Sequence, residues 1–472
     1  MPRIPPSLIK RAGSISPYLA ALLPTCRTIP SAQTELRWMR EHVARYFEQR
    51  DDKYQEWLDP DGLEPPPQQQ SSLTGIPQRW RGKQAKEAEK RLLLNHIIRR
   101  RAAGEPLQYV LGTQPFGDLD ILCERGVLIP RPETEAWALR LAGEVKGFWS
   151  RFTKKKREKE SEEEELENEN ENEVEEKALS ASELRILDVC SGTGCIGLLL
   201  YEQLAAPWRQ RQITDIQTRI RLLGLDINPK AVRLAQRNVE HNEQQELLRP
   251  DPCLDAIFHQ ADVFEDDWLT RMARDGAFPG AGKVPDVLEG GEQGAGEGQR
   301  HSRQPTARRA LGRGLIDVLV SNPPYISAKG FNKDTQRSVR NHEPRLALVP
   351  ELRDLAKTQT LQVEEEEDVF YARLLQIASI LRPRIAIFEV GDMEQAVRVV
   401  RMAMRHQHGG SGVSSSGHIV EGRDGEPLSV EIWRDWPDQR PEAGEDRTVS
   451  VLGRDVDIIG SGLGRAVVLR WG

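Results

Sequence analysis

The sequence is poor in cysteine and in long apolar runs. Its five cysteines among 472 residues are odd in number and scattered, which indicates a reducing compartment rather than a disulfide framework. Cys190 and Cys195 flank a glycine turn without a second Cys/His pair, so we expect no metal site. No apolar stretch is long enough to cross a bilayer, and we therefore expect a soluble protein with no membrane partner.

The chain also lacks a net positive charge, because 73 Asp and Glu residues outnumber 66 Lys and Arg residues and the formal net charge is -7. A protein that grips a long nucleic acid backbone needs a basic face, so we expect no sequence-specific nucleic acid binding. The first 34 residues, by contrast, contain no Asp or Glu and carry scattered basic, Ser and Thr residues. This composition is typical of an organellar transit peptide, but the apolar residues of the segment fit the first helix of a mature domain equally well.

The length predicts two domains with insertions. Residues 1–105 show helical apolar spacing and predict a bundle that docks a partner. Residues 106–130 predict a β-hairpin linker, with strands at Tyr109–Gly112, Leu119–Leu122 and Val127–Ile129. Residues 131–472 form the second domain. Its inserted loops are predicted near residues 151–181, 280–309, 351–368 and 409–447.

Strand and helix patterns alternate in the second domain, which predicts a doubly wound parallel sheet. The first strand, Arg185–Val189, runs into a glycine turn that begins at Cys190, and the second ends at Asp226. The pattern Gly192-x-Gly194-x-x-Gly197 fits a dinucleotide fingerprint and, taken alone, would also suit NAD.

Acidic residues at strand ends suggest how a nucleoside would bind. Asp226 could hold both ribose hydroxyls, although it could also be an ordinary acid at a helix N-terminus. Asp262 could accept a hydrogen bond from an adenine amine, and Val263 could pack on the ring.

A further strand runs into Asn322-Pro323-Pro324-Tyr325 and must stop there, because proline gives no N–H to a sheet. The corner offers the Asn322 side-chain oxygen and the Pro323 carbonyl to the two hydrogens of a planar NH2 group. We expect Tyr325 to pack on that group. Hydride transfer needs no such site, so the corner and Asp188, four residues before Gly192, favour S-adenosylmethionine over NAD.

The chain resembles the HemK/PrmC-like family of glutamine N5-methyltransferases that modify peptide-chain release factors. The resemblance rests on ordered blocks, which are Gly104–Gly112, Val127–Glu135, Asp188–Ile196, Gly224–Ala231, Ser321–Ile326, His342–Leu348 and Phe388–Gly391. It implies a Rossmann-like class I S-adenosylmethionine-dependent methyltransferase sheet, joined by a β-hairpin to an N-terminal helical-bundle domain. That bundle would hold the release factor while the catalytic domain receives a glutamine from its Gly-Gly-Gln motif.

The resemblance also implies the site residues. Those in contact with the cofactor would be Cys190, Ser191, Gly192, Thr193, Gly194, Asp226, Asp262, Val263 and Asn322. Those that hold the substrate amide would be Asn322, Pro323, Pro324 and Tyr325. Arg131, Glu133 and Glu135 either line the pocket rim or, in the interpretation we favour, brace the hairpin against the core.

Two alternative functions and one alternative location stay open at the level of sequence. A glutamine methyltransferase of a ribosomal protein would carry the same catalytic motifs. A methyltransferase of adenine N6 in DNA or RNA shares Asn-Pro-Pro-Tyr but should carry a basic groove. The acid-free N-terminus and the odd cysteines fit the mitochondrial matrix, with the cytoplasm as the alternative.

Overall fold

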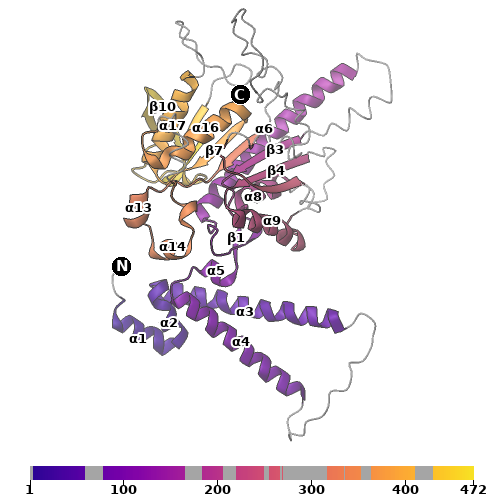
Figure 1. Ribbon diagram of the computed structural model, residues 1–472, viewed down its shortest axis with the longest axis vertical. Coiled ribbons are helices and arrows are strands. Elements are labelled where there is room, and N and C mark those ends of the chain that lie inside the picture. The colour runs from indigo at the N-terminus through magenta and orange to yellow at the C-terminus, as the bar shows by residue number, and fades with distance from the viewer. Residues whose placement is uncertain are drawn as a thin grey trace, which may run out of the picture. The chain divides into compact units, whose positions relative to one another are not determined.

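The computed structural model describes residues 4–58, 78–164, 183–205, 219–248, 255–265, 268, 316–333, 335–351, 363–409 and 429–471. The chain forms two compact units (Figure 1). One comprises Met1–Thr113 and Gln336–His342, and the other comprises Gln114–Thr335 and Glu343–Gly472. Among the described residues, no helix combines the length and the apolar character that crossing a membrane requires.

The first unit is helical. Its helices are α1 (Pro6–Ile15), α2 (Pro17–Cys26), α3 (Ile29–Leu58), α4 (Gln78–Ala102), α5 (Leu107–Leu111) and α14 (Arg337–His342). On α3 the buried residues Leu36, Met39 and Val43 follow the helical spacing of the sequence. Leu19, Leu22 and Leu23 of α2 are buried in the same core, so most of the acid-free segment is built into this unit.

Two arginines at the end of α4 fix the Gly104–Gly112 block within this unit. Arg101 forms a bidentate ion pair with Glu35 of α3, at 2.6 and 2.8 Å. Arg100 pairs in the same way with the buried Glu105, at 2.9 and 2.7 Å. Planar guanidinium–carboxylate pairs of this kind fix orientation as well as distance.

The second unit is built on a nine-stranded sheet with the order β5-β4-β3-β6-β7-β11-β8-β10-β9. Its strands are β3 (Glu183–Val189), β4 (Arg219–Asp226), β5 (Ala256–Gln260), β6 (Val318–Ser321), β7 (Ile385–Glu389), β8 (Ser429–Trp436), β9 (Thr448–Val451), β10 (Arg454–Ile459) and β11 (Ser461–Arg470). The first five strands in the order are parallel, and β11 is antiparallel to both neighbours. This is a Rossmann-like order with an antiparallel strand added, which confirms the predicted class I methyltransferase sheet.

Helices cover both faces of this sheet (Figure 1). They are α6 (Pro132–Glu164), α8 (Cys195–Ala205), α9 (Pro229–Gln244), α16 (Val369–Leu381) and α17 (Met393–Gly409). The short helix α13 (Ala328–Lys333) follows the corner after β6. Strand β3 shows why two layers form, since its side chains alternate. Leu187 and Val189 pack with α16 and α17, whereas Leu184 and Ile186 pack with α6, α8 and α9.

The hairpin of β1 (Thr113–Phe116) and β2 (Leu119–Leu122) forms a separate two-stranded sheet. Two fully buried asparagines of α9 hold β2. Asn242 accepts from the Asp120 N–H at 2.9 Å and donates to its carbonyl at 3.0 Å. Asn238 accepts from the Leu122 N–H at 2.7 Å and donates to the Thr193 carbonyl at 2.9 Å. Asn238 therefore ties the hairpin to the glycine turn after β3.

Two of the three strands predicted for the linker are wrong. Residues 109–111 belong to helix α5, which ends at Gly112 in a left-handed conformation with φ of 85°. Residues 127–129 form no strand, because the Ile129 N–H donates to the Glu343 carboxylate at 3.2 Å instead of to a neighbouring strand.

The predicted insertions also need correction where the structure describes them. Helix α6 continues to Glu164, into the loop predicted near 151–181. Strand β8 occupies 429–436, because its buried Ile432 and Trp433 lie between β11 and β10. Residues 366–368 form a short 3-10 helix with Asp368 fully buried. The predicted insertion at 280–309 and the ranges 165–181, 352–362 and 410–428 lie outside the described residues.

We predict that Asn238→Ala lowers the free energy of unfolding of the second unit by about 2–4 kcal/mol, since it leaves the partly buried Leu122 N–H and the buried Thr193 carbonyl without the Asn238 side chain as partner. Urea unfolding of the full chain measures this change. The matched control is Glu240→Ala on an exposed position of the same helix, which should stay within about 0.5 kcal/mol of the wild type. Equal midpoints for the two variants would contradict the assigned role of Asn238.

Candidate functional site

A pocket of about 990 Å³, open solvent at its mouth included, lies at the carboxyl ends of β3, β4, β5 and β6. Strand β3 pairs with β4 on one side and with β6 on the other, so the chain reverses direction across the sheet at this point. Open α/β sheets bind their ligands at such a switch point. The pocket is lined mainly by the turn after β3, the loops after β4 and β5, the corner after β6, and the segments 127–134 and 344–347.

Most of the residues that the sequence assigned to the site line this one pocket. They are Cys190, Ser191, Gly192, Thr193, Asp226, Asp262, Val263, Asn322 and Pro324. Gly194, Pro323 and Tyr325 do not line it. The pocket thus joins the glycine turn to the Asn322 corner, two elements about 130 residues apart in the sequence.

The glycine turn approaches the pocket with its backbone. Cys190 and Gly192 have φ of 60° and 57°, a left-handed conformation that is uncommon for a residue with a Cβ such as Cys190. A Cβ added at Gly192 would meet no protein atom within 4 Å, so the space in front of this residue is open. Ser191 is buried, and its hydroxyl has no hydrogen-bond partner among the described residues. The turn therefore approaches the pocket with backbone, and one buried hydroxyl beside it is left unpaired among the described residues.

Asp226 holds the turn in place. Its Oδ2 accepts from the Gly192 N–H at 2.9 Å, and its Oδ1 accepts from the Asn228 N–H at 2.8 Å, just before α9. Burial raises the pKa of this carboxyl, and the two backbone hydrogen bonds act in the opposite direction. Asp226 thus lines the pocket and orients Asn228, which caps α9 through its own side chain.

Asp188 lies behind the turn and is fully buried. Its Oδ2 accepts from the Gly197 N–H at 3.1 Å, while its Oδ1 has no partner among the described residues. Burial raises the pKa of this carboxyl to about 7. A cationic group that entered the pocket would favour the ionised form of Asp188.

The loop after β5 is shaped by its own backbone and by one arginine. Asp262 Oδ1 accepts from the Phe264 N–H at 3.0 Å. Arg373 of α16 donates through Nε to the Val263 carbonyl at 2.6 Å and through a terminal nitrogen to the Glu265 carbonyl at 3.3 Å. Arg373 therefore fixes the wall formed by Asp262 and Val263, and no sequence motif marked it.

The corner after β6 leaves its polar atoms available. Ser321 ends the strand, with its hydroxyl donating to the Val189 carbonyl at 2.8 Å. Among the residues that the structure describes, none hydrogen bonds to the Asn322 side chain or to the Pro323 carbonyl. The side-chain oxygen and the carbonyl are hydrogen-bond acceptors, so the corner can bind an amide NH2 group.

The segment 127–134 is a wall of the pocket that the sequence only partly indicated. Arg131 lines the pocket, one of the two alternatives that the sequence left open, and pairs with Glu343 Oε1 at 2.7 Å. Glu343 is almost fully buried and also accepts from Ile129 N–H. Glu133 and Glu135 lie in the first turn of α6 and do not line the pocket. Apolar residues complete this part of the site, namely Ile129, Pro130, Phe264, Leu346, Ala347 and Phe370.

Within the described ranges, no group of three or more His, Cys, Asp or Glu side chains could hold a metal ion.

No protein-family model matches the chain. The chain is 26% identical over 396 residues, 84% of this chain and 78% of the relative, to the mitochondrial MRF1 N(5)-glutamine methyltransferase MTQ1 of Saccharomyces cerevisiae. It is 27% identical over 298 residues, 63% of this chain and 67% of the relative, to the probable MRF1 mitochondrial N(5)-glutamine methyltransferase mtq1 of Schizosaccharomyces pombe.

A bacterial relative is the release factor glutamine methyltransferase of Haemophilus influenzae, 33% identical over 156 residues, 32% of this chain and 41% of the relative. Among solved structures, the N-terminal domain of human METTL16 in complex with SAH is similar with a TM-score of 0.32 at 12% identity, over 79% of this chain and 82% of that one. This structural likeness is too weak to bear on function. In sequence the chain is thus similar to proteins named as glutamine N5-methyltransferases and release factor glutamine methyltransferases, over the shares given above, and it carries a mostly parallel sheet of the class I methyltransferase type.

Proposed function

We propose that the protein transfers a methyl group from S-adenosylmethionine to the side-chain amide nitrogen of the glutamine in the Gly-Gly-Gln motif of a mitochondrial release factor. One observation carries the proposal most directly. Asn322, whose amide no described residue binds, lines the same pocket as the glycine turn and Asp226. Relatives whose names specify MRF1 or release factor glutamine support the choice of substrate.

The residues at the turn fit S-adenosylmethionine. The unpaired Ser191 hydroxyl and the open space at Gly192 suit the polar amino-acid end of the cofactor. Asp226 would bind the ribose hydroxyls with the lone pairs that its two backbone hydrogen bonds leave, and Asp262 and Val263 would bind the adenine. When bound, S-adenosylmethionine supplies an electrophilic methyl group.

The corner would make the glutamine nitrogen reactive by orienting it. An amide nitrogen is a poor nucleophile because its lone pair is delocalised into the carbonyl group. The Asn322 side-chain oxygen and the Pro323 carbonyl would each accept one amide hydrogen, and both hydrogen bonds strengthen as positive charge develops on nitrogen. The methylated amide then loses one proton to solvent, so no strong general base is needed. Positioning therefore accounts for most of the rate enhancement.

Tyr325 contributes differently from what the sequence suggested. Its ring does not line the pocket of the glycine turn, and its hydroxyl donates to Glu389 at 3.2 Å. Burial, with Glu389 nearby, raises the pKa of Tyr325 well above its usual value, so the phenol stays neutral. We therefore assign Tyr325 to the wall behind Asn322 rather than to packing on the amide group.

The substrate is tested by incubating the purified full chain with labelled S-adenosylmethionine and, separately, an organellar release factor, a ribosomal protein or DNA. We expect methylation of the release factor, on the glutamine of its Gly-Gly-Gln motif when the product is mapped by mass spectrometry. Asn322→Ala should abolish this transfer, because it removes one acceptor for the amide, and should leave cofactor binding largely intact. Turnover of DNA or the ribosomal protein alone, or a fully active Asn322→Ala variant, would refute the proposal.

Cofactor binding gives an independent prediction. Asp226→Ala should weaken the affinity for S-adenosylhomocysteine, measured by calorimetry, by roughly 1–3 kcal/mol, the scale of a lost hydrogen bond to a charged group. Glu240→Ala, which removes an exposed carboxylate on the adjoining α9, is the control and should bind as the wild type does. An unchanged dissociation constant for Asp226→Ala would argue against the ribose role.

We place the protein in the mitochondrial matrix. The proposal rests on the relatives named as mitochondrial. The acid-free first 34 residues do not add to it, because most of them are built into the helical unit. A full-length chain with a C-terminal tag, expressed from its own genomic locus, should therefore co-fractionate with mitochondria and resist protease in intact organelles. A cytosolic signal from the same tagged chain would overturn this placement.

A further inference from the structure

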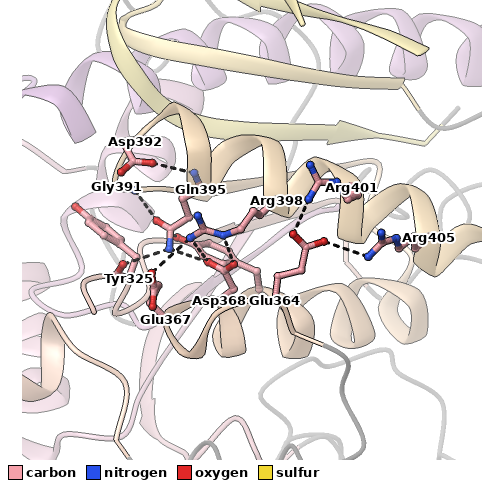
Figure 2. A network of polar contacts seen from close by, with 11 residues as sticks. Tyr325, Glu364, Glu367, Asp368, Gly391, Asp392, Gln395, Arg398, Arg401 and Arg405 are labelled. Carbon is pink, nitrogen blue, oxygen red and sulfur yellow. Dashed lines mark hydrogen bonds and ion pairs between the residues drawn. The ribbon is translucent and has the colours of Figure 1, made fainter. Parts of the chain in front are cut away.

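The segment Asn322–Tyr325, which carries the two proposed acceptors, is called the acceptor corner below. Its last residue, Tyr325, is contacted from three sides by residues outside this segment. Its hydroxyl donates to Glu389 Oε1 at 3.2 Å, and its main-chain carbonyl accepts from Gln395 Nε2 at 3.2 Å (Figure 2). Its ring lies against the backbone of Gly391, where an added Cβ would come within 3.2 Å of the ring. Neither Glu389 nor Gln395 lines the pocket.

Glu389 is the last residue of β7 and is buried. Its Oε2 accepts from the Thr134 hydroxyl at 2.6 Å and from the Trp137 indole N–H at 2.9 Å. All three side chains that bind it are donors, so they match a carboxylate that only accepts. Thr134 and Trp137 lie at the start of α6, and Glu389 thus connects the Val127–Glu135 block to Tyr325.

Gln395 of α17 has its amide orientation fixed by its neighbours. Its oxygen accepts from the Gly391 N–H at 2.8 Å, and its nitrogen donates to Asp368 Oδ1 at 3.0 Å as well as to Tyr325. Asp368 is fully buried and pairs with Arg398 of the same helix α17 (Figure 2). A buried carboxylate needs such a partner, and the pair keeps the Gln395 side chain on the Tyr325 carbonyl.

These contacts matter because the acceptor corner has too few backbone N–H groups to fix its own conformation. Pro323 and Pro324 have no N–H, so the segment between Ser321 and Tyr325 offers few hydrogen bonds of its own. Ser321 is fixed at one end by strand β6. At the other end, within the described part of the chain, the corner is connected to the core through Tyr325 and through Ile326, whose N–H donates to the Leu348 carbonyl at 2.8 Å.

We infer that Glu389 and Gln395 are positioning residues that fix Tyr325 and thereby preset the spacing of Asn322 and the Pro323 carbonyl before the substrate amide arrives. The inference rests on the proposed function for its kinetic consequence only. A site held close to its productive geometry loses less free energy in ordering the reactants. Substitution of Glu389 or Gln395 should therefore lower kcat strongly and change the affinity for the cofactor little.

Gln395→Met tests the carbonyl anchor, because methionine has a similar length and cannot donate to Tyr325. We expect kcat for release factor methylation to fall about tenfold or more, the equivalent of one lost hydrogen bond. The dissociation constant for S-adenosylhomocysteine should stay within about twofold, since Gln395 does not touch the pocket. Arg405→Ala is the control on the same helix, because its ion pair with Glu364 is exposed, and it should leave kcat unchanged (Figure 2).

Glu389→Gln tests the hydroxyl anchor, and Tyr325→Phe supplies a double-mutant cycle. If Glu389 acts through the Tyr325 hydroxyl, its substitution should lower kcat strongly in the wild type. The same substitution should have a much smaller effect in the Tyr325→Phe background, where that hydroxyl is already missing. Purely additive effects on kcat would overturn the role assigned to Glu389.

Amide hydrogen exchange tests the positioning role of Gln395 without any substrate. In Gln395→Met the amides of Tyr325 and Ile326 should exchange about tenfold faster than in the wild type, because the local opening free energy falls. Exchange and kcat both equal to those of the wild type would overturn the inference. If instead the wild type fails to methylate a release factor while exchange in the variant accelerates, the proposed function fails and the positioning role stands.

Discussion

Two consecutive prolines set the central constraint of the active site. They end β6 and present the Pro323 carbonyl, yet they take away the backbone donors with which a turn normally fixes itself. The acceptor corner therefore depends on the strand before it and on Tyr325 after it. Glu389 and Gln395, which hold Tyr325 at its hydroxyl and at its carbonyl, replace the backbone hydrogen bonds that the prolines cannot make.

Buried carboxylates join segments of the second unit across large sequence distances. Glu343 binds Ile129 and Arg131, and Glu389 binds Thr134, 255 residues before it. Each carboxylate is surrounded by donors from a different segment, so its burial cost is offset only when all of those segments are in place. The pocket wall formed by 127–134 is thus connected to the acceptor corner through Glu389, which binds both Thr134 and Tyr325.

The sequence predicted the sheet because β3, β4 and β7 are apolar runs that end at a polar or glycine-rich turn, and such local signals survive in the fold. Sequence-based prediction failed where a helix cap or a contact with a distant segment determines the local structure. Residues 109–111 have strand-like side chains but form a helical turn closed by Gly112. Residues 127–129 are extended but bond to Glu343, and Asp368 in an acidic run is buried by a partner 30 residues away. Arg373 and Gln395 act on backbone carbonyls, an interaction that leaves no motif.

The two halves of the site are stabilised in different ways, and this separates their roles. The half proposed to bind the cofactor is held mainly by its own strand-end loops, since Asp226 binds the N–H groups of Gly192 and Asn228 and Asp262 binds that of Phe264, while Arg373 of α16 adds one contact from outside. The acceptor half is held by side chains from α6, β7 and α17. The acceptor corner, by contrast, depends on the packing of α6 and α17 against β7. Substrate geometry is therefore the part of the site most sensitive to changes in the core, even where these lie far from the pocket.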